Sequence, residues 1–273
     1  MNAPLVITVA PNGARRTKAD HPALPLTPEE IAAAAAASRE AGAAVLHLHV
    51  RDKSLHHTLD PEIYRAATAA VRRAAGKAMI VQITTEAVGI FTPDEQMAAV
   101  RAVQPEAVSL AIRELIPDAK AEAAAAEFFI WLRQNRVLPQ FILYDPPDVA
   151  RFHDLRRRGL IPWDRPWVLF VLGRYASDMT GRPAELVAYI AAHDLDCPWS
   201  VCAFGPLESA CVVAAASLGG HGRVGFENNL RLADGSIAPD NAALVAQYAQ
   251  AAALIGRPVA DADAAREALG ACP

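Results

Sequence analysis

Short runs of apolar, often β-branched residues recur along the chain, separated by longer and more polar segments. Each run is almost continuously hydrophobic, as is expected of strands that are buried on both faces of a parallel sheet. Eight such runs lie at 5–10, 43–50, 78–84, 106–112, 137–144, 166–173, 198–204 and 222–226. The pattern therefore predicts eight buried parallel strands.

The segments between the runs begin with residues that favour helix N-termini. Thr27 and Glu30 have the spacing of a capping box, and Asp60, Thr92 and Asp240 can cap three later helices. Alanine-rich stretches inside these segments also favour helix, because alanine loses little side-chain entropy there. Each strand is thus expected to be followed by a helix.

Eight repeats of strand and helix predict a closed (β/α)8 TIM barrel, formed by residues 1–273 as a single domain. The same elements are also compatible with an open, doubly wound sheet. No GxGxxG follows the first apolar run and GxxxxGK[ST] does not occur in the chain, which argues against nucleotide-phosphate binding through those loops. In a barrel of this kind, functional residues are expected where the strands end.

The composition of the 273-residue chain suits a cytoplasmic protein that acts on small molecules. Hydrophobic residues make up 53% of the chain and the formal net charge is only -4, which provides no basic surface for nucleic acid. No segment has the apolar length of a membrane span, and the N-terminus lacks a signal-peptide pattern. The cysteines have the spacing of neither a zinc site nor a disulfide framework, so we expect reduced thiols at 197, 202, 211 and 272.

Two histidines end the second apolar run. His47 and His49 are two positions apart, and side chains with this spacing on a strand point to the same face, so both imidazoles can bind one ion. A histidine packed in the core against a backbone partner would give the same pattern. We expect a zinc-like site here, because paired imidazoles at a strand end suit that metal.

Glu227 directly follows the eighth apolar run and is expected to end the eighth strand. In a closed barrel the second and eighth strands flank the first, so Glu227 can join His47 and His49 around one ion. Three protein ligands leave a coordination position for water or substrate, as is typical of a catalytic zinc. Such an ion would act as a Lewis acid on a carbonyl group.

Four segments carry a family resemblance: VAPNGARRTK, AGAAVLHLHVRD, GGHGRVGFENN and AREALG. Over essentially its whole length the chain resembles the β-keto acid cleavage enzymes. The resemblance implies a zinc-bearing TIM barrel, usually a homotetramer, that converts a β-keto acid and acetyl-CoA into acetoacetate and the CoA ester of the shortened acid. It implies His47, His49 and Glu227 as the Zn²⁺ ligands and Arg223 as the cation that stabilises the oxyanions.

The chain departs from the family pattern at the catalytic base. Asn228 stands where the family usually has an aspartate that works with the arginine, and an amide cannot accept the proton. Glu86, at the end of the third run, is the candidate replacement, although a carboxylate at that place can also cap a helix. There are two alternatives to a replacement base. A water activated by the metal could remove the proton, or the activity could be weakened or changed.

The substrate-binding positions also differ. Arg15 stands where the family has an acidic residue for a substrate amine, which disfavours a cationic substrate. Arg15 or Arg16 could instead bind the second carboxylate of a dicarboxylic β-keto acid, or could simply be solvated.

Several hydroxyl and imidazole groups are secondary candidates. The hydroxyls that resemble carboxylate-binding groups of the family, and that could equally cap helices, are Thr84, Thr85 and Ser109. The histidines expected to be structural or exposed are His21, His56, His57, His153, His193 and His221.

Two other functions compete with β-keto acid cleavage. Metal-dependent amidohydrolases also carry a His-x-His pair at a strand end, but on the first strand and with further histidines and an aspartate that this sequence lacks. A barrel that binds metal and keto acid without turnover is the second alternative, and Asn228 is the residue that supports it.

Overall fold

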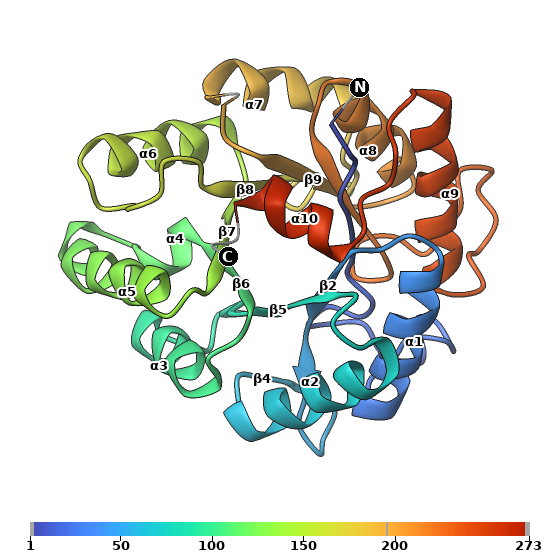
Figure 1. Ribbon diagram of the computed structural model, residues 1–273, viewed down its shortest axis with the longest axis horizontal. Helices are drawn as coiled ribbons and strands as arrows, with labels where there is room; N and C mark the ends of the chain where they lie inside the picture. Colours follow the sequence, from blue (N-terminus) through green and yellow to red (C-terminus); the bar gives the residue numbers. More distant parts are fainter. Residues whose placement is uncertain (1–2, 195, 271–273) are drawn as a thin grey trace.

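Eight parallel strands close into a barrel in this computed structural model, which describes residues 3–194 and 196–270 (Figure 1). Their order around the barrel is β1-β10-β9-β8-β7-β6-β5-β2. The strands are β1 (Ile7–Val9), β2 (Val45–Leu48), β5 (Ile80–Thr84), β6 (Ala107–Ala111), β7 (Leu138–Leu143), β8 (Trp167–Leu172), β9 (Trp199–Ala203) and β10 (His221–Val224). Each overlaps one predicted run, and the predicted TIM barrel is confirmed.

Helices surround the barrel and follow its strands (Figure 1). They are α1 (Pro28–Glu40), α2 (Pro61–Ala75), α3 (Pro93–Val103), α4 (Ile112–Leu115), α5 (Glu122–Gln134), α6 (Pro146–Arg157), α7 (Leu186–Ala192), α8 (Glu208–Ser217), α9 (Asn241–Leu254) and α10 (Ala262–Leu269), with 3₁₀ turns η1 (Ala119–Ala121) and η2 (Pro183–Glu185). A short hairpin, β3 (Val50–Arg51) and β4 (His57–Thr58), follows β2. No helix of the described residues is long and apolar enough to cross a membrane.

The predicted helix starts are formed by the expected side chains. Thr27 and Glu30 make both hydrogen bonds of a capping box at α1, and Asp60 accepts hydrogen bonds from the backbone at the start of α2. Thr92 caps α3 and Asp240 caps α9. These caps stabilise the helices because they satisfy backbone N–H groups that have no partner inside the helix.

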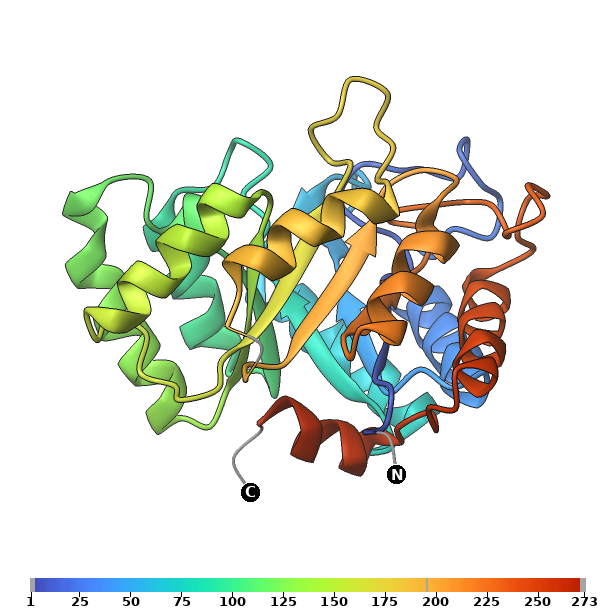
Figure 2. The same cartoon turned by 90° about the horizontal axis from the view of Figure 1, so that it is seen from above.

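The two ends of the barrel are built differently. Figure 2 shows α10 lying across the end where the strands begin. A buried cluster joins Ala265 and Leu269 of α10 to residues at the starts of the strands, among them Val45, Ile80 and Trp167. The opposite end, where the strands finish, carries the long connecting loops. Access to the barrel interior is therefore from the carboxyl ends of the strands.

The strand that leads to Glu227 is shorter than predicted. We expected Glu227 to end the eighth strand, but β10 ends at Val224 and the chain turns at Gly225, with a φ of +138°. A β-carbon at Gly225 would lie 2.4 Å from the carbonyl oxygen of Ala10. Close packing of this turn against the end of β1 requires glycine, and it places Glu227 on a loop above the barrel.

Candidate active site

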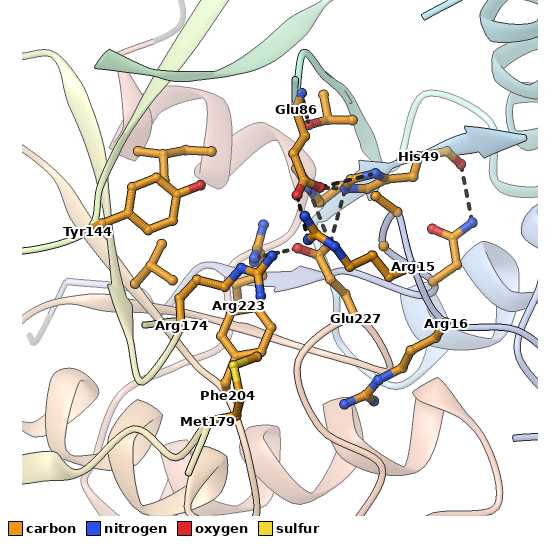
Figure 3. Close-up of a pocket in the computed structure, with 17 residues that line it drawn as sticks. Arg15, Arg16, His49, Glu86, Tyr144, Arg174, Met179, Phe204, Arg223 and Glu227 are labelled. Atoms are coloured by element: carbon orange, nitrogen blue, oxygen red, sulfur yellow. Dashed lines mark hydrogen bonds and ion pairs between the residues drawn. The ribbon is translucent and has the colours of Figure 1, made fainter. Parts of the chain in front are cut away.

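A cavity of about 150 Å³ lies at the mouth of the barrel. Its walls come from the loop after β1, from the loop after β10 and from the ends of β2, β5, β7, β8 and β9 (Figure 3). Residues far apart in the sequence meet there because parallel barrel strands all end on the same face.

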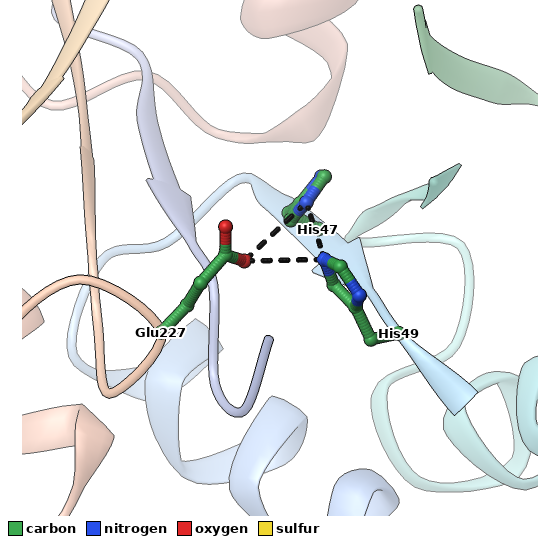
Figure 4. A group of neighbouring side chains, drawn as sticks. All are labelled: His47, His49 and Glu227. Atoms are coloured by element: carbon green, nitrogen blue, oxygen red, sulfur yellow. Dashed lines mark hydrogen bonds and ion pairs between the residues drawn. The ribbon is translucent and has the colours of Figure 1, made fainter. Parts of the chain in front are cut away.

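Three predicted metal ligands converge inside this cavity (Figure 4). The Nε2 atoms of His47 and His49 are 3.1 Å apart, and Oε2 of Glu227 lies 3.4 Å and 3.3 Å from them. The register explains the meeting, because β1 pairs with β2 on one side and with β10 on the other. The set suits a zinc ion with an open coordination position.

Neighbouring amides fix the tautomer of His47. Nδ1 of His47 lies 2.8 Å from Oε1 of Gln82, its register partner on β5, and the Gln82 amide nitrogen donates to Gln140 of β7 at 3.1 Å. The amide oxygen can only accept, so Nδ1 of His47 carries the hydrogen and Nε2 presents a lone pair. Such a partner orients a ligand imidazole toward the metal.

The electrostatics of the trio also suit a cation. Burial, followed by the nearby Arg223 guanidinium, lowers the pKa of His47 to about 3, which keeps the imidazole neutral. Burial alone would raise the pKa of Glu227, but Arg223 and the two imidazoles hold it well below its ordinary value. A neutral His47 imidazole and an ionised Glu227 carboxylate are the protonation states that metal binding requires of these two groups.

Glu86 and Arg15 both line the cavity and form an ion pair, with Arg15 Nη1 3.1 Å from Glu86 Oε1. The other Glu86 oxygen lies 3.9 Å from Nδ1 of His49, a buried nitrogen that has no hydrogen-bond partner among the described residues. Glu86 therefore lies between Arg15 and the candidate ligand His49 (Figure 3).

Arg223 and Asn228 have different surroundings. The buried Arg223 donates to Oε1 of Glu227 at 2.8 Å and lines the cavity. Asn228 is fully buried and is not among the described residues that line the cavity, and its side-chain nitrogen and oxygen have no partner among them.

The three hydroxyl residues separate into two groups. Thr84 lines the cavity and is the register partner of Ser109, so both side chains face the barrel interior. Thr85 is buried with its hydroxyl donating to the Ser109 carbonyl at 3.1 Å, and it does not line the cavity within the described chain. Of the three, Thr84 is the one in contact with the cavity.

Several residues of the site were not singled out from the sequence. Gln82 and Gln140 interrupt buried apolar strands, and a polar side chain at such a position signals a partner inside the barrel. Arg174, in the loop after β8, lines the cavity and has no recognisable motif. His57 packs against His49 with ring centroids 5.2 Å apart and donates to the Glu86 carbonyl, so it supports the site without lining it.

A buried carboxyl group holds the loop after β10 in place. Glu208, the first residue of α8, accepts hydrogen bonds from the Gly225 backbone at 3.3 Å and from Asn229 Nδ2 at 3.2 Å. Its complete burial raises its pKa to about 8. These contacts fasten both ends of the segment that carries Glu227.

Comparison with known proteins identifies the family. The sequence profile of the beta-keto acid cleavage enzymes matches residues 4–271. The chain belongs to this family. A 3-keto-5-aminohexanoate cleavage enzyme from Acetoanaerobium sticklandii is 32% identical to this β-keto acid cleavage enzyme, covering 97% of this chain and 98% of the relative. A 3-oxoadipate:acetyl-CoA acetyltransferase from Cupriavidus necator is 28% identical, covering 99% and 96%.

A solved structure supports the fold of this β-keto acid cleavage enzyme. The ternary complex of ObcA with a C4-CoA adduct and oxalate aligns with a TM-score of 0.71 at 18% identity, over 91% of this chain and 68% of that one. Within the described residues, His47, His49 and Glu227 form the one group of three or more potential metal ligands. In the part of the chain that the structure describes, no further histidine and no aspartate belongs to this ligand group, as an amidohydrolase would require.

The ligand assignment predicts that His47→Ala abolishes tight zinc binding, because it removes one of three converging donor atoms. We expect stoichiometric zinc in the wild-type protein after dialysis, zinc-dependent thermal stabilisation, and neither effect in the variant. His56→Ala, which removes an exposed imidazole close in sequence, is the control and should retain zinc. Retention of zinc by His47→Ala, measured by elemental analysis, would contradict the assignment.

The buried carboxyl group of Glu208 is expected to make the free energy of unfolding depend on pH. A pKa raised from 4.5 to about 8 means that the folded state holds the proton more tightly than the unfolded state. This contribution is complete below about pH 4.5 and is lost as the pH rises through about 8, at up to about 1.4 kcal/mol per pH unit. Glu208→Gln stays neutral, so its stability relative to wild type should increase from pH 5 to 8 in urea unfolding of the metal-free protein. Parallel pH profiles would show that Glu208 is ionised in the folded state.

Proposed function

We propose that this chain exchanges acyl groups between a β-keto acid and acetyl-CoA, releasing acetoacetate and the CoA ester of the shortened acid, with a zinc ion on His47, His49 and Glu227. The observation that carries the proposal is the convergence of these three donor atoms within 4.8 Å of one another in the cavity of a member of this family. The names of two relatives, a keto acid cleavage enzyme and an acetyl-CoA acetyltransferase, support the same reaction.

The residues present fit a zinc ion. His47 Nε2 offers a lone pair because Gln82 occupies its other nitrogen, and Glu227 Oε2 is buried without a hydrogen-bond partner among the described residues. When bound, zinc would supply Lewis acidity to the keto and carboxylate oxygens of the substrate, which acidifies the protons on C2. We propose zinc by analogy with the family, since the donor set alone also suits other divalent ions.

Two groups are proposed to bind and stabilise the substrate. The guanidinium of Arg223 lines the cavity beside Glu227, so it can stabilise the oxyanions that form when C2 attacks the thioester and when the CoA thiolate attacks the ketone. The hydroxyl of Thr84 lines the same cavity and can donate to the substrate carboxylate. Ser109, whose buried hydroxyl has no partner among the described residues, is proposed for the same role, with Thr85 holding the β6 backbone beside it.

We propose Glu86 as the base that removes the C2 proton. Its carboxylate lines the cavity, is about one-fifth exposed and lies next to His49, whereas the amide of Asn228 is enclosed and cannot titrate. The ion pair with Arg15 keeps the Glu86 side chain at the cavity wall. Arg15 also makes the entrance unfavourable for a cationic substrate.

A metal-binding barrel without turnover is the second candidate. Asn228 favours it, since the amide removes the carboxylate that the family usually has at this position. The family resemblance also leads us to propose a homotetramer located in the cytoplasm.

The reaction is tested by incubating the zinc-loaded protein with acetyl-CoA and a panel of neutral, cationic and dicarboxylic β-keto acids. We expect acetoacetate to form together with a new acyl-CoA in equal amounts, because the acyl group lost by one partner is gained by the other. Acetoacetate and acyl-CoA are measured by mass spectrometry. If neither acetoacetate nor a new acyl-CoA forms with any acid of the panel while zinc is bound, the result would support the binding role instead.

Glu86→Gln tests the base. The amide cannot accept a proton, so kcat should fall by about 100-fold or more, the usual contribution of general base catalysis, while zinc content stays unchanged. Asn228→Asp is the matched variant, because it returns a carboxylate to the position where the family has one. If Glu86→Gln retains kcat and Asn228→Asp raises it by tenfold or more, the base belongs to position 228.

A further inference from the structure

The candidate cavity has an excess of positive charge in its walls. Four arginines and two glutamates line it: Arg15, Arg16, Arg174, Arg223, Glu86 and Glu227. A bound divalent ion would add to this excess. The cavity is therefore suited to a ligand that carries more than one negative charge.

Three of these arginines are already engaged. Arg15 pairs with Glu86 at 3.1 Å and Arg223 pairs with Glu227 at 2.8 Å. Arg16 donates to two backbone carbonyl groups, those of Phe226 at 2.6 Å and Asn228 at 3.4 Å.

Arg174 differs from the other three. Its guanidinium has no hydrogen bond or ion pair to any residue that the structure describes, and its recorded contacts are with the rings of Phe204 at 5.2 Å and Tyr175 at 5.9 Å. A guanidinium that stacks on aromatic rings keeps the N–H groups at its edge free for an oxyanion. Arg174 is thus the cation of the cavity that is free to bind a ligand.

The backbone holds Arg174 at the cavity wall. Arg174 begins a loop that projects above the mouth of the barrel (Figure 2) and whose ends, Gly173 and Gly181, touch. A β-carbon on Gly173 would lie 2.1 Å from the Gly181 nitrogen, and that nitrogen donates to the carbonyl of Phe204 at 2.8 Å. The close contact between Gly173 and Gly181 fixes where the loop starts, and with it the backbone position of Arg174.

An apolar surface accompanies Arg174 in the cavity. Ile142, Val171 and Met179 line it together with the rings of Tyr144 and Phe204. Figure 3 shows Tyr144, Arg174, Met179 and Phe204 on one side, away from His49. A ligand that reaches from the metal ligands to Arg174 would pass an apolar wall and then meet a cation.

We propose that Arg174 binds the distal carboxylate of a dicarboxylic β-keto acid whose aliphatic chain lies against this apolar wall. The inference rests on the proposed function and specifies its substrate class. The sequence alone pointed to Arg15 or Arg16 for this carboxylate, and the contacts of both with other protein groups are the reason to place it on Arg174.

The phosphates of CoA are the other oxyanions that Arg174 could bind. A long pantetheine arm separates them from the thioester, so when the thioester is at the metal ligands the phosphates lie far from the cavity that Arg174 lines. Arg174 lines the same cavity as His47 and His49, so the keto acid is the partner within its reach.

The test compares wild type, Arg174→Ala and Arg174→Lys on a dicarboxylic β-keto acid and a neutral one of equal chain length, and measures KM for acetyl-CoA in each. We expect Arg174→Ala to lower kcat/KM for the dicarboxylic acid by about 10- to 100-fold, the effect of losing a charge-assisted hydrogen bond, and by less than about threefold for the neutral acid. Arg174→Lys should fall between, because the ammonium keeps the charge without the bidentate geometry. Arg73→Ala, which removes an exposed arginine on α2, controls for net charge.

An equal loss of kcat/KM for both acids would overturn the proposal. A raised KM for acetyl-CoA with the acid preference unchanged would also overturn it and would assign Arg174 to a phosphate of CoA. Titration calorimetry of the zinc-loaded protein with the dicarboxylic acid, without acetyl-CoA, separates this inference from the reaction itself. If no acid is turned over, binding that Arg174→Ala weakens still supports the proposal. Binding that is absent, or equal in both proteins, overturns it.

Discussion

The candidate site depends on the pairing of β1 with both β2 and β10. These two hydrogen-bonded ladders bring together segments that are about 180 residues apart in the chain, so that His47 and His49 from one side meet Glu227 from the other. Without barrel closure the two histidines would lack the third ligand, Glu227. The turn at Gly225 and the contacts of Glu208 then fix how far the carboxylate reaches over the mouth.

The barrel interior near this site is polar, and several of its polar groups contact one another. Gln82 donates to Gln140 and orients His47, and Arg223 stabilises the buried charge of Glu227. The amide of Asn228 is enclosed and, like the Ser109 hydroxyl, has no partner among the described residues. Burying a polar group costs free energy unless it gains a partner, so the Gln82–Gln140 contact and the pair of Arg223 with Glu227 lower the cost of placing the site inside the barrel.

The cavity wall is divided between the two halves of the barrel. The β2, β5 and β10 side carries imidazole, hydroxyl and charged groups, which suit the chemistry that members of the family share. The β7, β8 and β9 side carries apolar and aromatic groups and the Arg174 loop. A division of this kind lets loops on one side change the substrate while the reacting groups on the other side stay in place.

The sequence by itself determined the eight strands, the helix caps and the family, because these depend on local periodicity, on capping chemistry and on motifs that are contiguous in the chain. It favoured a TIM barrel over an open sheet, and the pairing of β1 with β10 in the structure decided closure. It also indicated His47 and His49, whose two-residue spacing is a local property, and Glu227 through barrel closure. Only the tertiary structure decided the partners of each charged group: that Arg15 is taken up by Glu86, that Gln82 sets the tautomer of His47, and that Arg174 is left free. These facts depend on distances between side chains from different strands, and hydrophobic periodicity carries no information about such distances.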